Sequence, residues 1–265
     1  MKAKIGNLNI NYEFLPRGNA PTVILSHSLG TDFRMWEPQM KALTSRFSVL
    51  RYDTRGHGQS EAVDGDYTFE QLKDDAIGLA DFLGVEKFHW VGLSMGGMIG
   101  QSIAFNHPER LESLVLCDTA ASMPDEAQPK WQERINTAKE KGLQGVVDST
   151  LEDWFTKELL ERRPQSIRQV IDQFLKTSLQ GYVGCIGAIR KLNHMDSLSS
   201  IKCPTLIIVG EQDFGTPVEA SLAMRERIPE SQLAVIPSAA HISNVEQPEK
   251  FQEKLMNFLL SVVQF

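Results

Sequence analysis

Apolar runs of strand length recur along this chain and alternate with segments of helical periodicity. After two segments of alternating apolar and polar residues, such runs lie at 22–26, 47–52, 89–93, 114–117, 205–209 and 233–236. Helical stripes lie between and after them, at Phe69, Leu72, Ala76, Leu79, Ala80 and Leu83, and at Phe251, Leu255, Phe258 and Leu259. Strands that are apolar on both faces and alternate with helices predict an α/β fold, a mostly parallel β-sheet flanked by helices.

This alternation stops between residues 117 and 205, where no strand-like run occurs. The gap carries helical patterns instead, the clearest being Ile167, Val170, Ile171, Phe174 and Leu175, with another at Leu143, Val146, Val147 and Leu151. A structureless loop of this length is uncommon in a compact domain, so we predict a helical cap insertion at 121–197 and a core of 1–120 and 198–265. Ligands of open α/β sheets bind beyond the carboxyl ends of the strands, which the cap should cover.

The segment around Ser94 combines a strand, a sharp turn and a helix. Gly92-Leu93-Ser94-Met95-Gly96 reads G-x-S-x-G and lies between the run 89–93 and an apolar helical segment at 99–105. Such a turn strains the serine backbone and lifts the hydroxyl clear of the sheet, and side chains at Gly92 and Gly96 would collide with neighbouring backbone. The helix N-terminus also supplies N–H groups and a positive dipole end. Ser94 is therefore the predicted nucleophile.

A serine hydroxyl needs a base to remove its proton and an acid to orient that base, here in the chain order Ser, Asp, His. Two histidines follow the start of the insertion. His194 ends a helical pattern and is typical of a surface or partly buried residue. His241 follows the run 233–236 through a loop of small residues and precedes the C-terminal helix. The sequence thus predicts His241 as the base.

The acid should follow the preceding strand. Gly210-Glu211-Gln212-Asp213 offers two carboxylates after the run 205–209, and Thr216-Pro217 indicates the start of the next helix. We expect Asp213 to hold the imidazole in the correct tautomer, and Glu211 to be a solvated loop residue.

An oxyanion hole requires two N–H donors near the nucleophile. The loop at 27–32 follows the strand-like run 22–26, so the expected donors are the backbone amides of Leu29 and Met95. His27 should brace this loop through a structural hydrogen bond.

The charge balance excludes several other classes. Twenty-seven basic and thirty-four acidic residues give a net charge of −7, which provides no attraction to nucleic acid or to an anionic membrane.

No apolar run approaches the roughly twenty residues of a spanning helix, and the N-terminus has no signal-peptide pattern. Cys117, Cys185 and Cys203 are odd in number and widely spaced, so we expect free thiols, a cytoplasmic location and no zinc site.

Four motifs together resemble the α/β-hydrolase superfamily over essentially the whole chain. They are the Ser94 motif, the Asp213 segment, His241 before Ile242-Ser243, and Asp53-Thr54-Arg55-Gly56-His57-Gly58-Gln59-Ser60. The resemblance implies the α/β-hydrolase fold and a catalytic triad of Ser94, His241 and Asp213. It also implies that 53–60 is a structural turn, with His57 as a scaffold residue.

A narrower resemblance, to 3-oxoadipate enol-lactonases, rests on two stretches. These are Ser28-Leu29-Gly30-Thr31-Asp32 and, in the cap, Trp131-Gln132-Glu133-Arg134-Ile135. The resemblance implies hydrolysis of a small lactone to 3-oxoadipate in bacterial breakdown of protocatechuate and catechol. No metal ion or organic cofactor is required, and the oligomeric state is left open. The substrate-binding residues expected on this basis are Ser28, Trp131, Arg134 and Trp154.

Several alternatives stay open at this stage. Arg134 lies one helical turn from Trp131 and can face the cleft to bind the substrate carboxylate, or it can be a surface residue paired with a carboxylate such as Glu133 or Glu140. The tryptophans can instead pack the cap onto the core. A general carboxylesterase, a cofactor-free perhydrolase and a ligand receptor on the same fold are the other functions considered. A serine nucleophile argues against haloalkane dehalogenases and epoxide hydrolases, which use a carboxylate.

Overall fold

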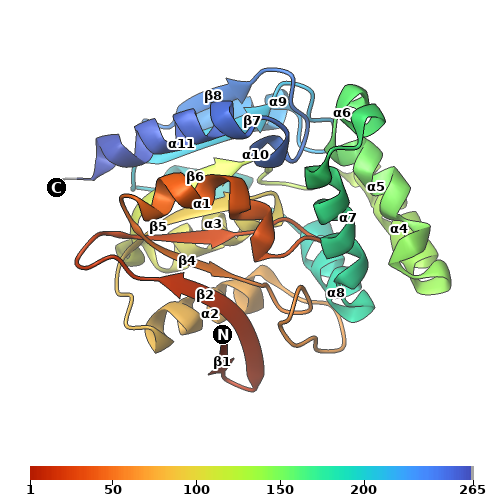
Figure 1. The fold of residues 1–265 in the computed structure, drawn as a ribbon, viewed down its shortest axis with the longest axis horizontal. Coiled ribbons are helices and arrows are strands. Elements are labelled where there is room, and N and C mark those ends of the chain that lie inside the picture. The colour runs from red at the N-terminus through yellow and green to blue at the C-terminus, as the bar shows by residue number, and fades with distance from the viewer. Residues whose placement is uncertain (264–265) are drawn as a thin grey trace.

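A computed structural model describes residues 1–263 of the chain, and one eight-stranded sheet runs through it (Figure 1). The strand order is β1-β2-β4-β3-β5-β6-β7-β8. The β1–β2 and β2–β4 pairs are antiparallel, and all pairs from β4 to β8 are parallel. The strands are β1 (Lys2–Ile5), β2 (Leu8–Leu15), β3 (Thr22–Ser26), β4 (Ser48–Tyr52), β5 (Phe88–Leu93), β6 (Leu111–Cys117), β7 (Thr205–Gly210) and β8 (Gln232–Ile236). The predicted α/β-hydrolase fold, mostly parallel and flanked by helices, is confirmed.

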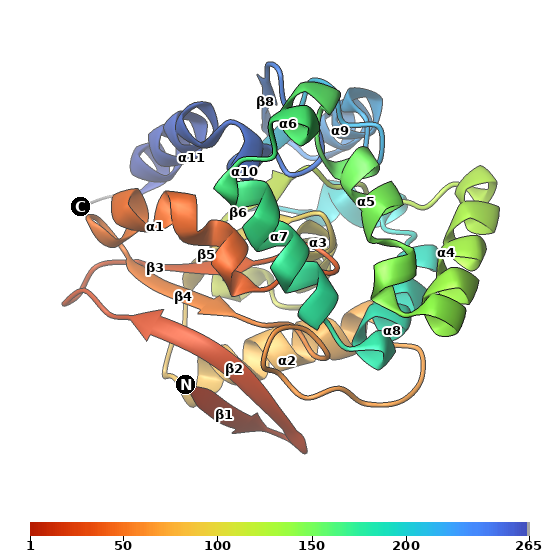
Figure 2. The same ribbon diagram turned by 45° about the vertical axis from the view of Figure 1, so that its right-hand side comes forward.

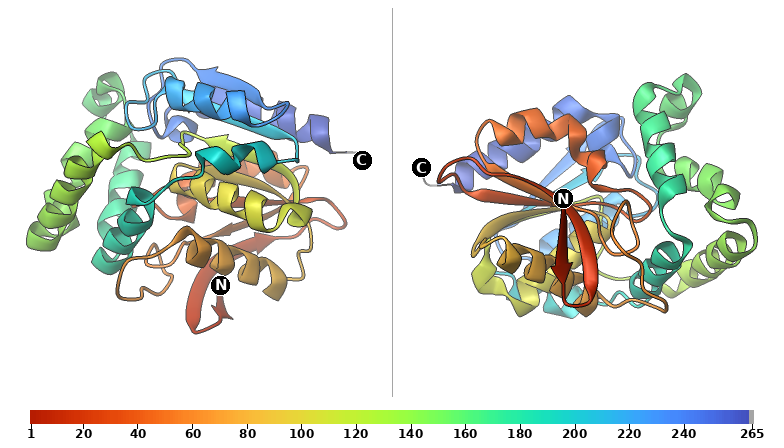
Figure 3. Two further views of the ribbon diagram at one scale, coloured as in Figure 1. Left: turned by 180° about the vertical axis from the view of Figure 1, so that it is seen from behind. Right: turned by 60° about the horizontal axis from the view of Figure 1, so that its bottom comes forward.

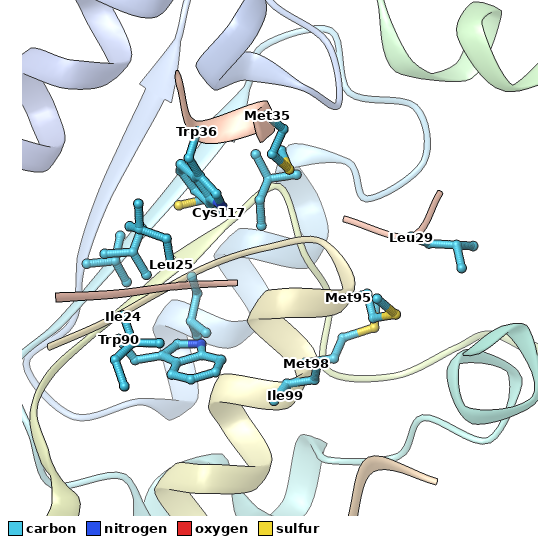
Figure 4. Packing of buried hydrophobic residues seen from close by; sticks show 14 of the residues in the cluster. Ile24, Leu25, Leu29, Met35, Trp36, Trp90, Met95, Met98, Ile99 and Cys117 are labelled. Carbon is cyan, nitrogen blue, oxygen red and sulfur yellow. The ribbon is translucent and has the colours of Figure 1, made fainter. Parts of the chain in front are cut away.

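The central strands are buried along their whole length because helices cover both faces of the sheet. Every residue of β4, β5 and β7 is buried. One face carries α1 (Glu37–Thr44), α10 (Ser243–Glu246) and α11 (Pro248–Val262), and the other carries α2 (Phe69–Phe82), α3 (Met95–Asn106) and α9 (Val218–Arg227) (Figures 1 and 3). In the core, Ile24 and Leu25 of β3 lie near Trp90 of β5, and Met98 and Ile99 extend from α3 (Figure 4).

Five helices lie between β6 and β7, within the segment predicted as the cap. They are α4 (Gln128–Lys141), α5 (Val147–Trp154), α6 (Lys157–Arg162), α7 (Gln165–Lys176) and α8 (Leu179–Arg190). They lie together beside the sheet in Figure 1, and α4 lies farthest from it in Figure 2. The pattern predicted through 143–151 is split, since a 3₁₀ turn at Leu143–Gly145 precedes α5. The boundaries at 121 and 197 stay a prediction.

Aromatic side chains hold the cap helices together. The ring of Phe174 on α7 lies edge-on to Trp154 of α5 and to Tyr182 of α8, with centroids 5.7 and 5.4 Å apart. All three side chains are buried. Edge-on aromatic pairs add to the free energy of burial, so this cluster fixes α5, α7 and α8 relative to one another.

The helices and the three cysteines can be compared with what the sequence predicts. None of the helices within residues 1–263 combines the length and the apolar composition needed to cross a membrane. Cys117 and Cys185 are buried, Cys203 is half-buried, and each has a free thiol.

Candidate active site

Ser94 occupies a strained turn between β5 and α3. Its backbone has φ 54° and ψ −114°, a left-handed φ that a side-chain-bearing residue adopts only under constraint. A Cβ atom added to Gly92 would collide with the backbone of Gly96, and one added to Gly96 would collide with the backbone of Ser26. The two glycines therefore allow the close packing that holds Ser94 in this conformation, as the sequence motif predicts.

The structure brings Ser94, His241 and Asp213 together at the carboxyl ends of the parallel strands. Ser94 Oγ lies 2.9 Å from His241 Nε2, and His241 Nδ1 lies 2.8 Å from Asp213 Oδ2. Ser94 follows β5, Asp213 lies in the loop after β7, and His241 lies in the loop between β8 and α10. All three side chains are buried. The three residues predicted as nucleophile, base and acid thus form one hydrogen-bonded chain.

Asp213 is held as a carboxylate by several donors in addition to His241. Its Oδ1 accepts hydrogen bonds from the amides of Gly215 (2.8 Å) and Thr216 (2.9 Å), and its Oδ2 accepts one from Thr216 Oγ1 (2.7 Å). Burial alone would raise the pKa of Asp213, but the attraction of His241 and these hydrogen bonds outweigh it and lower the pKa. The side chain is therefore charged and fixed in orientation.

His241 is arranged to accept a proton at Nε2. Because the Asp213 carboxylate accepts the Nδ1 proton, Nε2 is the free acceptor that faces Ser94 Oγ. Burial acts to lower the pKa of His241, but the charge and hydrogen bond of Asp213 outweigh it and raise the pKa above its ordinary value. A base with a raised pKa binds the serine proton more strongly, and Asp213 stabilises the resulting cation.

The two amides expected to bind an oxyanion belong to Met95, which directly follows Ser94, and to Leu29. Met95 is the first residue of α3, and Leu29 lies in the loop after β3. Within residues 1–263, neither backbone N–H donates a hydrogen bond to a protein acceptor. Both donors are therefore available to a ligand atom that carries negative charge.

Two buried histidines brace the Leu29 loop. His27 Nε2 accepts a hydrogen bond from the Thr54 amide (2.9 Å), and His57 Nε2 accepts one from the Gly30 amide (3.0 Å). Their ring centroids are 5.2 Å apart. Burial lowers the pKa of His27, and it lowers the pKa of His57 to about 3 together with repulsion from His27. Both rings are thus neutral acceptors, and they hold the loop from the 53–60 turn.

A cavity of about 400 Å³ lies beside Ser94 and His241, between the core and the cap. All four predicted substrate-binding residues line it, namely Ser28, Trp131, Arg134 and Trp154. The hydroxyl of Ser28 is buried and has no hydrogen-bond partner within the described chain. Such a group is costly unless a ligand satisfies it. The wall also contains residues that no sequence motif indicated, including Met98, Met123, Asp153, Tyr182 and Phe214.

The wall contains two cations that share one carboxylate. Arg134 Nη2 donates to Asp153 Oδ2 (2.8 Å), and Lys130 Nζ donates to Asp153 Oδ1 (2.8 Å). The guanidinium of Arg134 also lies 5.3 Å from the centre of the Trp131 ring. Arg134 is thus paired with a carboxylate, as one alternative expected, but the partner is Asp153 of α5 rather than Glu133 or Glu140, and the Arg134 side chain is mostly buried. The group carries a net charge of +1.

Glu211 and His194, the alternatives for acid and base, lie outside the hydrogen-bonded chain, and the two tryptophans have more than one role. Glu211 is exposed and accepts a hydrogen bond from the Ser238 amide, away from His241. His194 lies between the rings of Phe69 and Phe105, and its Nδ1 lies 3.1 Å from Gln101 Oε1. Trp154 is buried against Phe174, while Trp131 is only partly buried. Both tryptophans therefore contribute to packing as well as to the cavity wall.

The sheet topology, the strained serine turn and the order Ser, Asp, His define an α/β hydrolase. The chain belongs to the α/β-hydrolase fold family, whose model matches residues 21–248. Within this family, it is 36% identical over 242 residues to 3-oxoadipate enol-lactonase 2 of Acinetobacter baylyi, an alignment that covers 91% of this chain and 90% of the relative.

Two further comparisons give the range of similarity. The crystal structure of the enol-lactonase from Burkholderia xenovorans LB400 has a TM-score of 0.94 and 37% identity, and the match covers 98% of this chain and 100% of that one. RutD of Caulobacter sp. (strain K31), provisionally named a carbamate hydrolase, is 30% identical over 254 residues, or 92% of each chain. Enzymes with two different substrate classes are thus similar to this chain.

Proposed function

We propose that this protein hydrolyses 3-oxoadipate enol-lactone to 3-oxoadipate through an acyl-enzyme formed on Ser94. One observation carries the proposal: the hydrogen-bonded group of Ser94, His241 and Asp213 opens into a cavity with excess positive charge on its wall. The similarity to two enol-lactonases over nearly the whole chain supports the choice of substrate. The substrate is a small molecule, and neither chemical step needs a metal ion or an organic cofactor.

The first half of the reaction opens the lactone ring. Ser94 Oγ attacks the lactone carbonyl while His241 Nε2 takes the hydroxyl proton, and the amides of Leu29 and Met95 stabilise the oxyanion. Collapse of the tetrahedral intermediate breaks the bond between the carbonyl carbon and the ring oxygen. The ring oxygen leaves as an enol that receives the proton from His241. Because the enol ketonises, the reverse reaction is suppressed.

The second half releases the product. His241 Nε2 removes a proton from a water molecule, which attacks the acyl-enzyme carbonyl, and the same two amides again stabilise the oxyanion. The intermediate collapses, Ser94 regains its proton from His241, and 3-oxoadipate leaves. Asp213 stabilises the imidazolium in both halves without becoming protonated itself.

The cavity wall accounts for the choice of an anionic lactone. A carboxylate on the substrate interacts with Arg134 and Lys130, whose two charges are balanced by Asp153 alone among the ion pairs of residues 1–263. Arginine binds carboxylates through directed hydrogen bonds, so this contact also orients the lactone carbonyl toward Ser94. Ser28 adds an unpaired buried hydroxyl on the same wall. We therefore expect charged lactones to react faster than neutral ones.

A substrate panel tests this function directly. Purified protein is assayed with 3-oxoadipate enol-lactone, with p-nitrophenyl acetate and butyrate, and with a simple carbamate. We expect kcat/KM for the enol-lactone to fall between about 10⁴ and 10⁸ M⁻¹s⁻¹ and to exceed that of each neutral ester and of the carbamate. Preference for a neutral ester indicates a general carboxylesterase, and preference for the carbamate indicates a carbamate hydrolase. Either result overturns the lactonase proposal.

A further inference from the structure

A fourth side chain, Asp118, lies behind the three that form the hydrogen-bonded chain. It directly follows β6, is completely buried and has a left-handed φ of 44°. Its Oδ1 accepts a hydrogen bond from the Gly210 amide (2.8 Å), and its Oδ2 lies 2.6 Å from Ser243 Oγ. A non-glycine residue keeps this strained backbone conformation only where the surrounding contacts hold it there, and here those contacts are made by the carboxyl group.

These contacts join the loops that carry the acid and the base. Gly210 ends β7 and lies three residues before Asp213, and Ser243 begins α10 two residues after His241. The neighbouring Thr119 donates from Oγ1 to the carbonyl oxygen of Ser94 (2.7 Å). Two consecutive residues after β6 therefore contact Ser94 itself, the strand that leads into the Asp213 loop and the helix that follows the His241 loop.

The charges around Asp118 favour its neutral form. The groups that face it are the Asp213 carboxylate, the His241 imidazole and the adjacent thiol of Cys117. Within residues 1–263, no lysine or arginine forms an ion pair with Asp118, and the one nearby imidazole is already paired with Asp213. Burial, followed by repulsion from Asp213, raises the pKa of Asp118 well above its ordinary value, and this outweighs the attraction of His241 and the hydrogen bonds from Ser243 and Gly210, which act to lower it. A buried carboxyl group without its own counter-charge binds a proton rather than remaining ionised.

We propose that Asp118 is a positioning residue that holds a proton at neutral pH and joins the Asp213 loop to the His241 loop as an uncharged carboxylic acid. Its carbonyl oxygen Oδ1 accepts the Gly210 N–H, and the proton on Oδ2 is shared with Ser243 Oγ in the 2.6 Å contact. An uncharged acid fixes the Asp213–His241 distance without competing with Asp213 for the imidazolium. The kinetic part of this proposal rests on the proposed hydrolase mechanism; the protonation state does not.

The variant Asp118→Asn separates positioning from charge. Asparagine keeps one acceptor for Gly210 and one donor for Ser243, so we expect kcat within about threefold of the wild type. The acidic limb of the pH profile of kcat/KM should keep its midpoint, because no charge is removed. An ionised Asp118 would stabilise the His241 cation, and its replacement would then shift that midpoint to lower pH. A shift of about half a unit or more overturns the proposal.

Removal of both contacts should slow the chemical step. Asp118→Ala is expected to lower kcat by about 10- to 100-fold with KM within about twofold of the wild type, because the acid and base loops lose their connection. Ser243→Ala, which removes only the Oδ2 partner, should give a smaller loss in the same parameter and serves if Asp118→Ala does not fold. Ser221→Ala is the matched control and should not change kcat, because Ser221 is a buried serine of α9 whose hydroxyl has no hydrogen-bond partner in the described part of the chain. Full kcat in Ser243→Ala overturns the positioning role.

Infrared spectroscopy reads the proton without any turnover. The difference spectrum of wild type minus Asp118→Asn at pH 7 isolates Asp118 from the other buried carboxyl groups. We expect a positive band from the C=O stretch of a protonated carboxylic acid, displaced in D₂O. A carboxylate band in its place overturns the proposal even if the protein is an active lactonase. Conversely, a protein that fails to hydrolyse the enol-lactone can still show the acid band, and its pH profile can be measured on whichever ester it hydrolyses.

Discussion

Ser94 Oγ lies 2.9 Å from His241 Nε2, although 147 residues separate the two in the chain. The parallel sheet makes this contact possible, because β5 and β8 end at the same edge and each delivers its residue in the following loop. The intervening chain contains β6, β7 and the cap helices, so the segment between nucleophile and base also supplies Asp213 and most of the cavity wall.

The tautomer of His241 depends on Asp213, and Asp213→Asn should reverse it. An amide at this position favours the wrong tautomer, so we expect kcat to fall by about 10⁴-fold with little change in KM. Glu211→Gln is the matched control, because Glu211 is exposed in the same loop and was the alternative acid. Steady-state kinetics of the two variants show which of the two carboxylates orients the base. Comparable losses in both would contradict the assignment of Asp213.

Arg134→Ala should raise KM for the anionic lactone more than for a neutral ester. Loss of a charge-assisted hydrogen bond to the substrate carboxylate should reduce kcat/KM by about 10- to 100-fold for the lactone and by less than about threefold for p-nitrophenyl acetate. The control is Lys139→Ala, an exposed cation on the same helix α4. An equal fall with both substrates would mean that Arg134 supports the cap through Asp153 and does not recognise the substrate.

The fold could be predicted because burial on both faces leaves a plain pattern in the sequence. All six apolar runs form strands, and their bounds differ from the prediction by three residues or fewer, as at β6. The stripes at 69–83 and 251–259 form α2 and α11. The split of the 143–151 pattern was missed because spacing of apolar residues does not distinguish one helix from a short turn followed by a helix.

The site was predictable where chain order and loop position constrain it. Ser94, Asp213 and His241 each follow a strand, and the sheet brings strand ends together. Asp153 and Asp118 were not found, for different reasons. The partner of Arg134 depends on how α4 and α5 pack, which helical periodicity does not give. Asp118 follows an apolar strand, but its burial and its contacts with Gly210 and Ser243 exist only in three dimensions.

Stability in acid should depend on His57. Its pKa is about 3 in the folded protein and 6.5 in the unfolded chain, so the unfolded state binds a proton that the folded state does not. This contribution is fully present above pH 6.5 and is lost as the pH falls toward 3. In His57→Gln this pH-dependent contribution to stability is absent, because glutamine does not titrate. The amide oxygen of the glutamine can still accept the Gly30 N–H.

Urea denaturation of wild type and His57→Gln between pH 7 and pH 4 measures this effect. We expect the wild type to be more stable at pH 7, and its advantage in free energy of unfolding to shrink by about 1.4 kcal/mol per pH unit below pH 6. An advantage that stays constant across this range would show that His57 titrates normally in the folded protein.

Glu246 connects the cap to the loop of His241. Its Oε1 accepts a hydrogen bond from the Thr156 amide (3.1 Å), and its Oε2 accepts one from the Ala240 amide (2.9 Å). In Glu246→Gln, the new NH₂ group cannot accept the Ala240 N–H, which leaves a buried donor unpaired at a cost of about 1–3 kcal/mol. We expect Tm to fall by about 2–10 °C. Glu158→Gln, exposed on α6, should leave Tm unchanged, and equal Tm values for both variants would disprove the connection.

The most direct test of the account is kcat/KM for 3-oxoadipate enol-lactone, measured with the wild type and with Ser94→Ala. In the proposed mechanism Ser94 Oγ is the atom that attacks the lactone. We therefore expect rapid turnover by the wild type and a loss of about 10⁶-fold in kcat/KM in the variant. Circular dichroism should show that the variant keeps its fold. A folded Ser94→Ala protein that opens the enol-lactone at a rate near that of the wild type would contradict the account.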